Sequence, residues 1–192
     1  KGSGTVVLKG PEPGGLAFPL VRTVADIEQY YEFRAALEAE TAALAAERHT
    51  PATLAAIRAA LAEAEEMGRL GVSELSGDIN FRFHRAIARA TGNAFHIAAI
   101  DALPNLIGLG PLEVRHAGHT DPEARNQVIL DEHRAIFEAI RRREADLAGA
   151  EMRAHILAAR RFVFQRHPAW PDAAPVAITG REQPGAIRED LP

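Results

Sequence analysis

The 192-residue sequence contains no cysteine, so it has neither disulfide bonds nor thiolate ligands for a metal. It has no long apolar run either, because charged residues interrupt every apolar stretch before the roughly 18 residues that a membrane-spanning helix needs. No secretory signal peptide is recognisable among the first residues. These absences predict a soluble, cytoplasmic protein.

An excess of positive charge is missing as well. The sequence has 22 Lys and Arg residues against 26 Asp and Glu residues, which gives a formal net charge of −4. Nucleic-acid binding needs clustered positive charge to contact phosphates, so this chain is not expected to bind DNA by a basic surface of its own. Hydrophobic residues make up 47% of the sequence, enough for the core of one domain of this length.

The sequence is rich in Ala, Leu, Glu and Arg, which have high helix propensity. Capping signals mark two helix starts: Thr23 with Asp26 three residues later, and Thr50 followed by Pro51. Pro104 is expected to break or kink a helix that starts near residue 94. The other expected helices span residues 24–48, 51–70, 78–91, 122–143 and 145–166. With short connections, they predict an all-α fold, an antiparallel bundle of about six to seven helices.

Three of the eight histidines fall inside apolar helical faces and are therefore expected to point into the core: His84, His133 and His155. Helices that face one another in a bundle can bring such side chains together, and imidazole is the commonest ligand of zinc and related cations. The alternative is a polar network of hydrogen bonds without a metal. The remaining histidines (49, 96, 116, 119 and 167) are expected to be solvated at helix ends or in loops.

Other polar residues share these faces. Asn80 precedes His84 by one helical turn, so its amide oxygen is a candidate fourth metal ligand. Arg34 lies in the apolar stripe of the first helix, where it needs a carboxylate partner, either a Glu of a neighbouring helix or a ligand. Asn126 lies two turns before His133 and is a weaker candidate for the same cavity. Glu132 and Glu151 are expected to point away from the histidines. The Arg141–Arg143 run is interpreted as a charged helix C-terminus.

Four stretches of this sequence resemble the FCD domain, the C-terminal effector-binding domain of the FadR subfamily of GntR-type bacterial transcription regulators. They are residues 30–48 (YYEFRAALEAETAALAAER), 80–93 (NFRFHRAIARATGN), 131–139 (DEHRAIFEA) and 152–156 (MRAHI). The resemblance implies a helical bundle that binds a divalent metal and a small organic acid. The family's metal ligands, an Asp and three His, map onto Asn80, His84, His133 and His155, so position 80 departs from the usual Asp. Arg34 matches an arginine that holds the effector's carboxylate, and Asn126 is grouped with it as effector-binding.

The resemblance also implies a domain organisation. Residues 1–22 resemble the end of a winged helix-turn-helix wing with a linker, residues 23–167 form the effector-binding domain, and residues 168–192 form a Pro-rich tail. The rest of the DNA-binding domain is expected to be missing from this chain. The chain should then form a homodimer and bind effector, contacting DNA only through that missing domain and no membrane. The expected metal is zinc, with nickel or manganese as alternatives.

We therefore expect a ligand-sensing, non-enzymatic domain that controls DNA binding. Two alternatives remain open at this point. One is a helical-bundle metalloenzyme in which an open metal position activates water. The other is a domain whose metal is purely structural and whose main role is to dimerise.

Overall fold

The computed structural model describes residues 18–21, 23–70, 77–106 and 122–165. Within these ranges it contains six helices: α1 (Val24–Arg48), α2 (Pro51–Arg69), α3 (Gly77–Ala90), α4 (Ala94–Leu106), α6 (Pro122–Arg141) and α7 (Ala145–Gln165). The predicted all-α bundle is therefore confirmed. None of the described helices is both long enough and apolar enough to span a membrane. The proposed 168–192 tail and most of the 1–22 segment lie outside the described residues.

Both predicted capping signals begin helices. The Thr23 hydroxyl accepts a hydrogen bond from the backbone N–H of Asp26, whose carboxylate accepts one from the backbone N–H of Thr23. Thr50 caps α2 in the same reciprocal way, with Thr53 as its partner and Pro51 in the first turn. Of the expected break or kink at Pro104, the break does not occur, because α4 continues through it to Leu106. Proline lacks a backbone N–H, so a single hydrogen bond, from position 104 back to the carbonyl of Ile100, is lost there.

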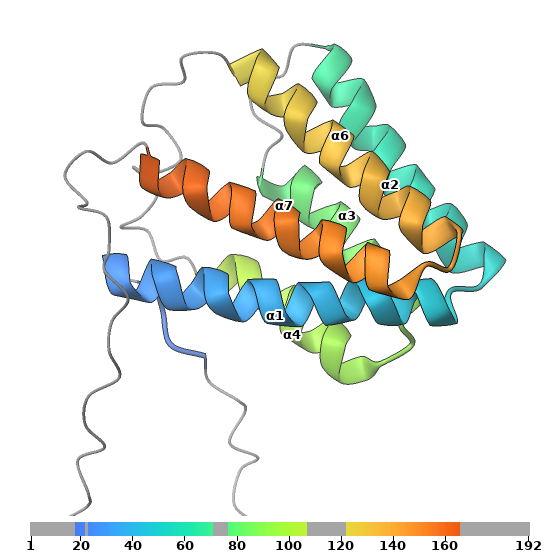
Figure 1. Ribbon diagram of the computed structural model, residues 1–192, viewed down its shortest axis with the longest axis horizontal. Coiled ribbons are helices and arrows are strands. Elements are labelled where there is room, and N and C mark those ends of the chain that lie inside the picture. The colour runs from blue at the N-terminus through green and yellow to red at the C-terminus, as the bar shows by residue number, and fades with distance from the viewer. Residues whose placement is uncertain (1–17, 22, 71–76, 107–121, 166–192) are drawn as a thin grey trace, which may run out of the picture.

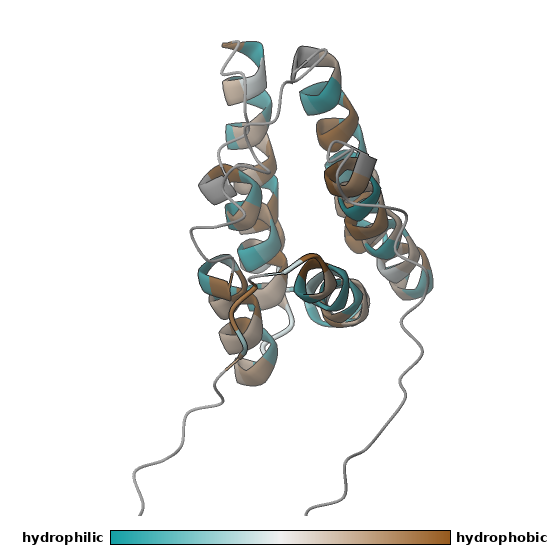
Figure 2. Ribbon diagram, turned by 90° about the vertical axis from the view of Figure 1, so that its left-hand side faces the viewer, coloured by the Kyte–Doolittle hydropathy of each residue, from teal (hydrophilic) through white to brown (hydrophobic). Residues whose placement is uncertain are grey.

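Five of the helices form a closed ring, in which α1 packs against α7, α7 against α6, α6 against α2, α2 against α3, and α3 against α1. In Figure 1, α1 and α7 lie side by side and run in opposite directions. The short helix α4 packs on the outside, mainly against α3. Hydrophilic and hydrophobic residues alternate along the helices, as is typical of amphipathic helices that share one core (Figure 2).

Small residues set the close approach of α1 and α7. Ala42, Ala45 and Ala46 of α1 and Ala148 of α7 are completely buried. A Cβ atom on Gly149 would lie 3.2 Å from the carbonyl oxygen of Ala39, closer than an ordinary van der Waals contact. The two backbones are therefore nearly in contact, and side chains on α1 and α7 that face the interior of the ring are held at fixed positions.

Arg143, in the turn between α6 and α7, caps the end of α1. Its guanidinium donates hydrogen bonds to the carbonyl oxygens of Ala46 (3.3 Å), Glu47 (2.8 Å) and His49 (2.9 Å). These carbonyls have no partner within their own helix, because the last turn of a helix leaves its acceptors free. The Arg141–Arg143 run is thus not simply a charged helix C-terminus: its last member joins two segments far apart in the sequence.

Replacing Arg143 by alanine should lower the free energy of unfolding by about 1–2 kcal/mol, since three charge-assisted hydrogen bonds are lost. Alanine keeps the cost of the positive backbone angle at this position (φ 61°), so the variant isolates the side chain. Urea unfolding measures the change. Arg142→Ala is the matched control, because Arg142 is exposed and its ion pair with Glu138 is long, at 3.8 Å, and therefore weak. Equal stability of the two variants would contradict the capping role.

Candidate metal centre

Three histidines meet inside the helical ring. His84 comes from α3, His133 from α6 and His155 from α7, and one ring nitrogen from each lies within 4.8 Å of the others. The ring centroids are 5.5 Å apart for His84 and His133, 5.3 Å for His84 and His155, and 4.8 Å for His133 and His155. All three residues are buried, with exposures of 1% for His84, 0% for His133 and 3% for His155. The structure thus brings together the three residues that the sequence singled out.

Helical periodicity and aromatic packing place these rings. Phe83, which is completely buried, stacks on the ring of His133 with a centroid distance of 4.2 Å and an interplanar angle of 19°. The same phenylalanine and Phe81 flank His84, with centroid distances of 5.9 Å on each side. Apolar walls exclude water from the histidines and limit rotation of their rings. The cluster is therefore preorganised by its surroundings.

Two of the three rings have a carboxylate at Nδ1. Oε2 of Glu132 lies 2.7 Å from Nδ1 of His155, within hydrogen-bonding distance. Oε2 of Glu38 lies 2.5 Å from Nδ1 of His84, although this close contact lacks the alignment of a hydrogen bond. The expectation that Glu132 points away from the histidines is wrong. It precedes His133 on α6, but its flexible side chain reaches across to α7.

Several polar atoms of the cluster have no hydrogen-bond partner among the described residues. They are Nε2 of His84, both ring nitrogens of His133, and Oδ1 of Asn80, one helical turn before His84. Buried polar atoms are almost always satisfied, so a group of unsatisfied donors and acceptors needs an explanation. All of them are atoms that can ligate a cation such as zinc, and three histidines with one further oxygen match its usual coordination number. The residues present therefore fit a divalent metal.

The buried environment keeps the rings in the form that can bind a cation. Desolvation lowers the pKa of His133 well below its usual value, and the neighbouring His155 and His84 lower it further. Desolvation also lowers the pKa of His155, although its hydrogen bond to Glu132 opposes the shift. Both rings are thus neutral at pH 7, and neutral imidazole has the free lone pair that metal coordination requires.

Arg34 is buried, 5% exposed, as the sequence indicated, but its partner was not predicted correctly. Its Nε donates to Oε1 of Glu38 at 2.6 Å, so the salt bridge lies within α1 and not between neighbouring helices. Burial alone would raise the pKa of Glu38, but Arg34 and His84 outweigh it and lower this pKa to about 2. The four-residue spacing of Arg34 and Glu38 was the sequence signal that could have identified Glu38.

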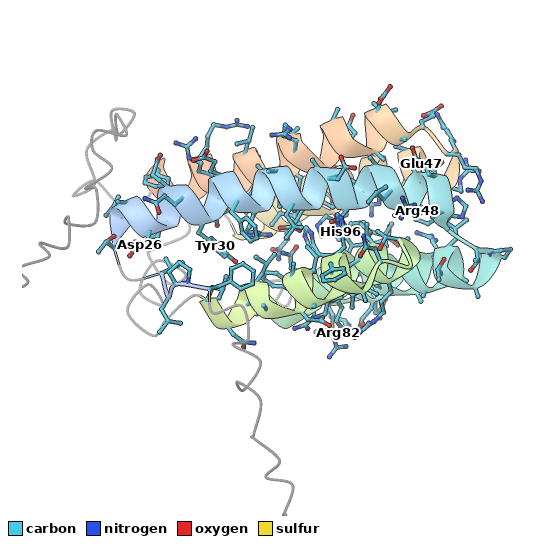
Figure 3. The ribbon with its side chains drawn as sticks, turned by 90° about the horizontal axis from the view of Figure 1, so that it is seen from below. Asp26, Tyr30, Glu47, Arg48, Arg82 and His96 are labelled. Carbon is cyan, nitrogen blue, oxygen red and sulfur yellow. The ribbon has the colours of Figure 1, made fainter. Side chains whose placement is uncertain are left out.

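Asn126 and the other described histidines are not part of the three-histidine cluster. Asn126 is buried on α6, two turns before His133, but it is not one of the three clustered ligands. His49 is also buried, contrary to expectation, at the corner between α1 and α2. His96 is half-buried between α1 and α4 and forms a 2.7 Å hydrogen bond with Thr41, so it too is not simply solvated (Figure 3). His116, His119 and His167 lie outside the described residues.

Comparison with known proteins identifies relatives of this domain. The HTH-type transcriptional regulator LutR of Bacillus subtilis (strain 168) is 31% identical over 142 residues, which cover 73% of this chain and 64% of LutR. The chain thus spans less than two thirds of that relative's length. LutR is an HTH-type transcriptional regulator.

Two solved structures share the fold. E. coli McbR/YncC superimposes with a TM-score of 0.65 at 19% identity, covering 75% of this chain and 66% of that one. Streptococcus agalactiae GntR gives a TM-score of 0.56 at 22% identity, with coverages of 70% and 58%. The FCD domain model matches residues 29–158, which include most of α1 and α7, all of α2, α3, α4 and α6, and all three clustered histidines. The chain therefore belongs to the FCD domain family.

Proposed function

We propose that this domain is the effector-sensing part of a GntR-type transcription regulator, and that it binds a small organic acid at a divalent metal held by His84, His133 and His155. The observation that carries the proposal is the buried convergence of three imidazoles from three helices. Their ring nitrogens lie within 4.8 Å of one another, and those of His133 have no hydrogen-bond partner in the part of the chain that the structure describes. Family membership and the similarity to LutR support the regulatory role.

The charge of the site supports an anionic effector. The three imidazoles and the Asn80 amide are neutral ligands, and the charges of Arg34 and Glu38 cancel. A bound divalent ion supplies positive charge and Lewis acidity, and only Glu132 offsets part of that charge within the cluster. A carboxylate is therefore the ligand that such a centre prefers. Arg34 and Asn126 are the residues proposed to contact this effector. Zinc is the proposed metal, with nickel and manganese as alternatives.

The position of the site links acid binding to the arrangement of the helices. The proposed ligands lie on α3, α6 and α7, which form most of the helical ring. Any difference in acid affinity between two arrangements of these helices shifts the equilibrium between them. In a homodimer that carries winged helix-turn-helix domains, such a shift would change their spacing and hence the affinity for DNA. Light scattering on the purified chain should give about twice the monomer mass of 20.7 kDa.

A zinc titration combined with an acid screen tests the proposal. Metal-free protein should bind one equivalent of zinc, measured by elemental analysis after dialysis. The melting temperature should then rise with a small carboxylic acid only when zinc is present. An acid at 100 times its dissociation constant stabilises the folded domain by about 2.7 kcal/mol, which is easily detected. Protein that takes up no zinc, or an acid response that does not depend on zinc, would contradict the proposed centre.

A further inference from the structure

The carboxylate of Glu38 connects Arg34 to the histidine cluster. Its Oε1 accepts a 2.6 Å hydrogen bond from Arg34 Nε, and its Oε2 lies 2.5 Å from Nδ1 of His84. The Glu38 side chain is 1% exposed, so the protein must supply its partners. The three side chains therefore form a continuous buried chain that begins on α1 and ends at a candidate metal ligand on α3.

We infer that Arg34 and Glu38 are positioning residues for the metal centre, which hold the proton of His84 on Nδ1 and leave its Nε2 as the ligand atom. This inference rests on the proposed metal site. A neutral imidazole has one N–H and one lone pair, and an anionic oxygen beside Nδ1 favours the proton there. The opposite nitrogen, Nε2, is buried and has no hydrogen-bond partner among the described residues, so its lone pair can serve as a ligand.

The contrast between Glu38 and Glu132 explains why an arginine is needed. Glu132 forms a 2.7 Å hydrogen bond with Nδ1 of His155, and its side chain is 25% exposed, so water also solvates it. Glu38 has almost no access to water, and Arg34 holds its Oε1 at 2.6 Å, which leaves Oε2 beside Nδ1 of His84. Arg34 thus fixes the position of the Glu38 carboxylate, and through it favours the ligating tautomer of His84.

The surroundings of Arg34 agree with this indirect role. Its guanidinium carbon lies 5.6 Å, 5.5 Å and 5.2 Å from the ring centroids of Tyr30, Tyr31 and Phe81. Aromatic packing from three residues together with the Glu38 ion pair holds the group in place. The family resemblance assigns the arginine at this position to the effector carboxylate. The positioning role adds the prediction that changes at Arg34 alter metal affinity even when no acid is present.

The test measures zinc affinity of the full chain, without any acid, by competition with a chelating zinc indicator. Glu38→Gln should weaken zinc binding about 10- to 100-fold, as loss of a carboxylate behind a ligating histidine does. The visible spectrum of the Co²⁺-loaded protein should change with it. Arg34→Met should weaken zinc binding similarly, and Arg34→Lys should retain more affinity because it keeps a cation beside Glu38. The double variant Arg34→Met/Glu38→Gln buries no unpaired charge. Its zinc affinity is measured in the same way if a single variant does not fold.

Glu28→Gln is the matched control, because Glu28 also lies on α1 and pairs with an arginine, Arg160, but makes no contact with the cluster histidines that the structure describes. Its zinc affinity and Co²⁺ spectrum should equal those of the wild type. Wild-type affinity in folded Glu38 variants would overturn the positioning role. So would an Arg34→Met protein that loses acid binding but keeps its zinc affinity, since Arg34 would then be an effector contact only. Wild-type protein that binds no zinc would instead refute the proposed metal centre itself.

Discussion

Arg34→Met should lower the free energy of unfolding by about 3–5 kcal/mol, the cost of leaving one member of a buried ion pair without its partner. Glu38 would then keep a carboxylate that is 1% exposed, with His84 as its remaining polar neighbour. Methionine fills a similar volume, so the change reports on charge more than on packing. Urea unfolding of the metal-free protein measures it.

Two further variants isolate the contribution of the unpaired charge. Arg34→Met/Glu38→Leu removes both charges and should be more stable than Arg34→Met alone, because no buried carboxylate is left uncompensated. Arg160→Met breaks the ion pair with Glu28, whose side chains are 38% and 25% exposed, and should cost less than about 1 kcal/mol. If Arg34→Met and Arg160→Met lower the free energy of unfolding by similar amounts, burial does not increase the cost of breaking the Arg34–Glu38 pair.

His133→Ala should abolish the stabilisation of the domain by zinc. With free zinc about 1,000-fold above its dissociation constant, the wild type gains about 4 kcal/mol, which raises its melting temperature by many degrees. His133 is completely buried, and neither of its ring nitrogens has a hydrogen-bond partner among residues 18–21, 23–70, 77–106 and 122–165. Its removal therefore takes away a ligand without breaking a hydrogen bond within these ranges. Thermal unfolding of both proteins, each with and without zinc, measures the difference between the two shifts.

His96→Ala provides the control for this experiment. His96 is a half-buried histidine that packs between α1 and α4 and bonds to Thr41, outside the three-histidine cluster. Its replacement should lower the melting temperature of the metal-free protein but leave the zinc-dependent shift intact. A zinc-dependent shift of wild-type size in His133→Ala would show that the metal binds elsewhere.

Much of this structure could be predicted because helical patterns are local. The Thr23–Asp26 capping box and the Thr50–Pro51 pair defined the starts of α1 and α2, since each signal involves residues at most three apart. The inward direction of His84, His133 and His155 followed from the apolar faces on which they lie. Their convergence required only that these helices face one another, as helices in a bundle do.

What the sequence could not reveal depends on long side chains and on tertiary contacts. Glu132 reaches a histidine on another helix through three rotatable bonds, which helical position does not determine. Arg143 caps a helix that ends almost a hundred positions earlier, and no local pattern indicates such a contact. Glu38 was missed for a different reason: its spacing from Arg34 was visible, but the partner was sought on other helices.

His84 lies on a helix far along the chain from the consecutive helices that carry His133 and His155, and this has a consequence for folding. A cysteine-free chain has no covalent cross-link, so nothing in its unfolded state holds these segments near one another. An ion coordinated by all three would act as a reversible cross-link. It would close the segment from His84 to His133 and the segment from His133 to His155 at once. The free energy of unfolding of the domain would then rise with the concentration of free ion. A disulfide cannot provide this form of control.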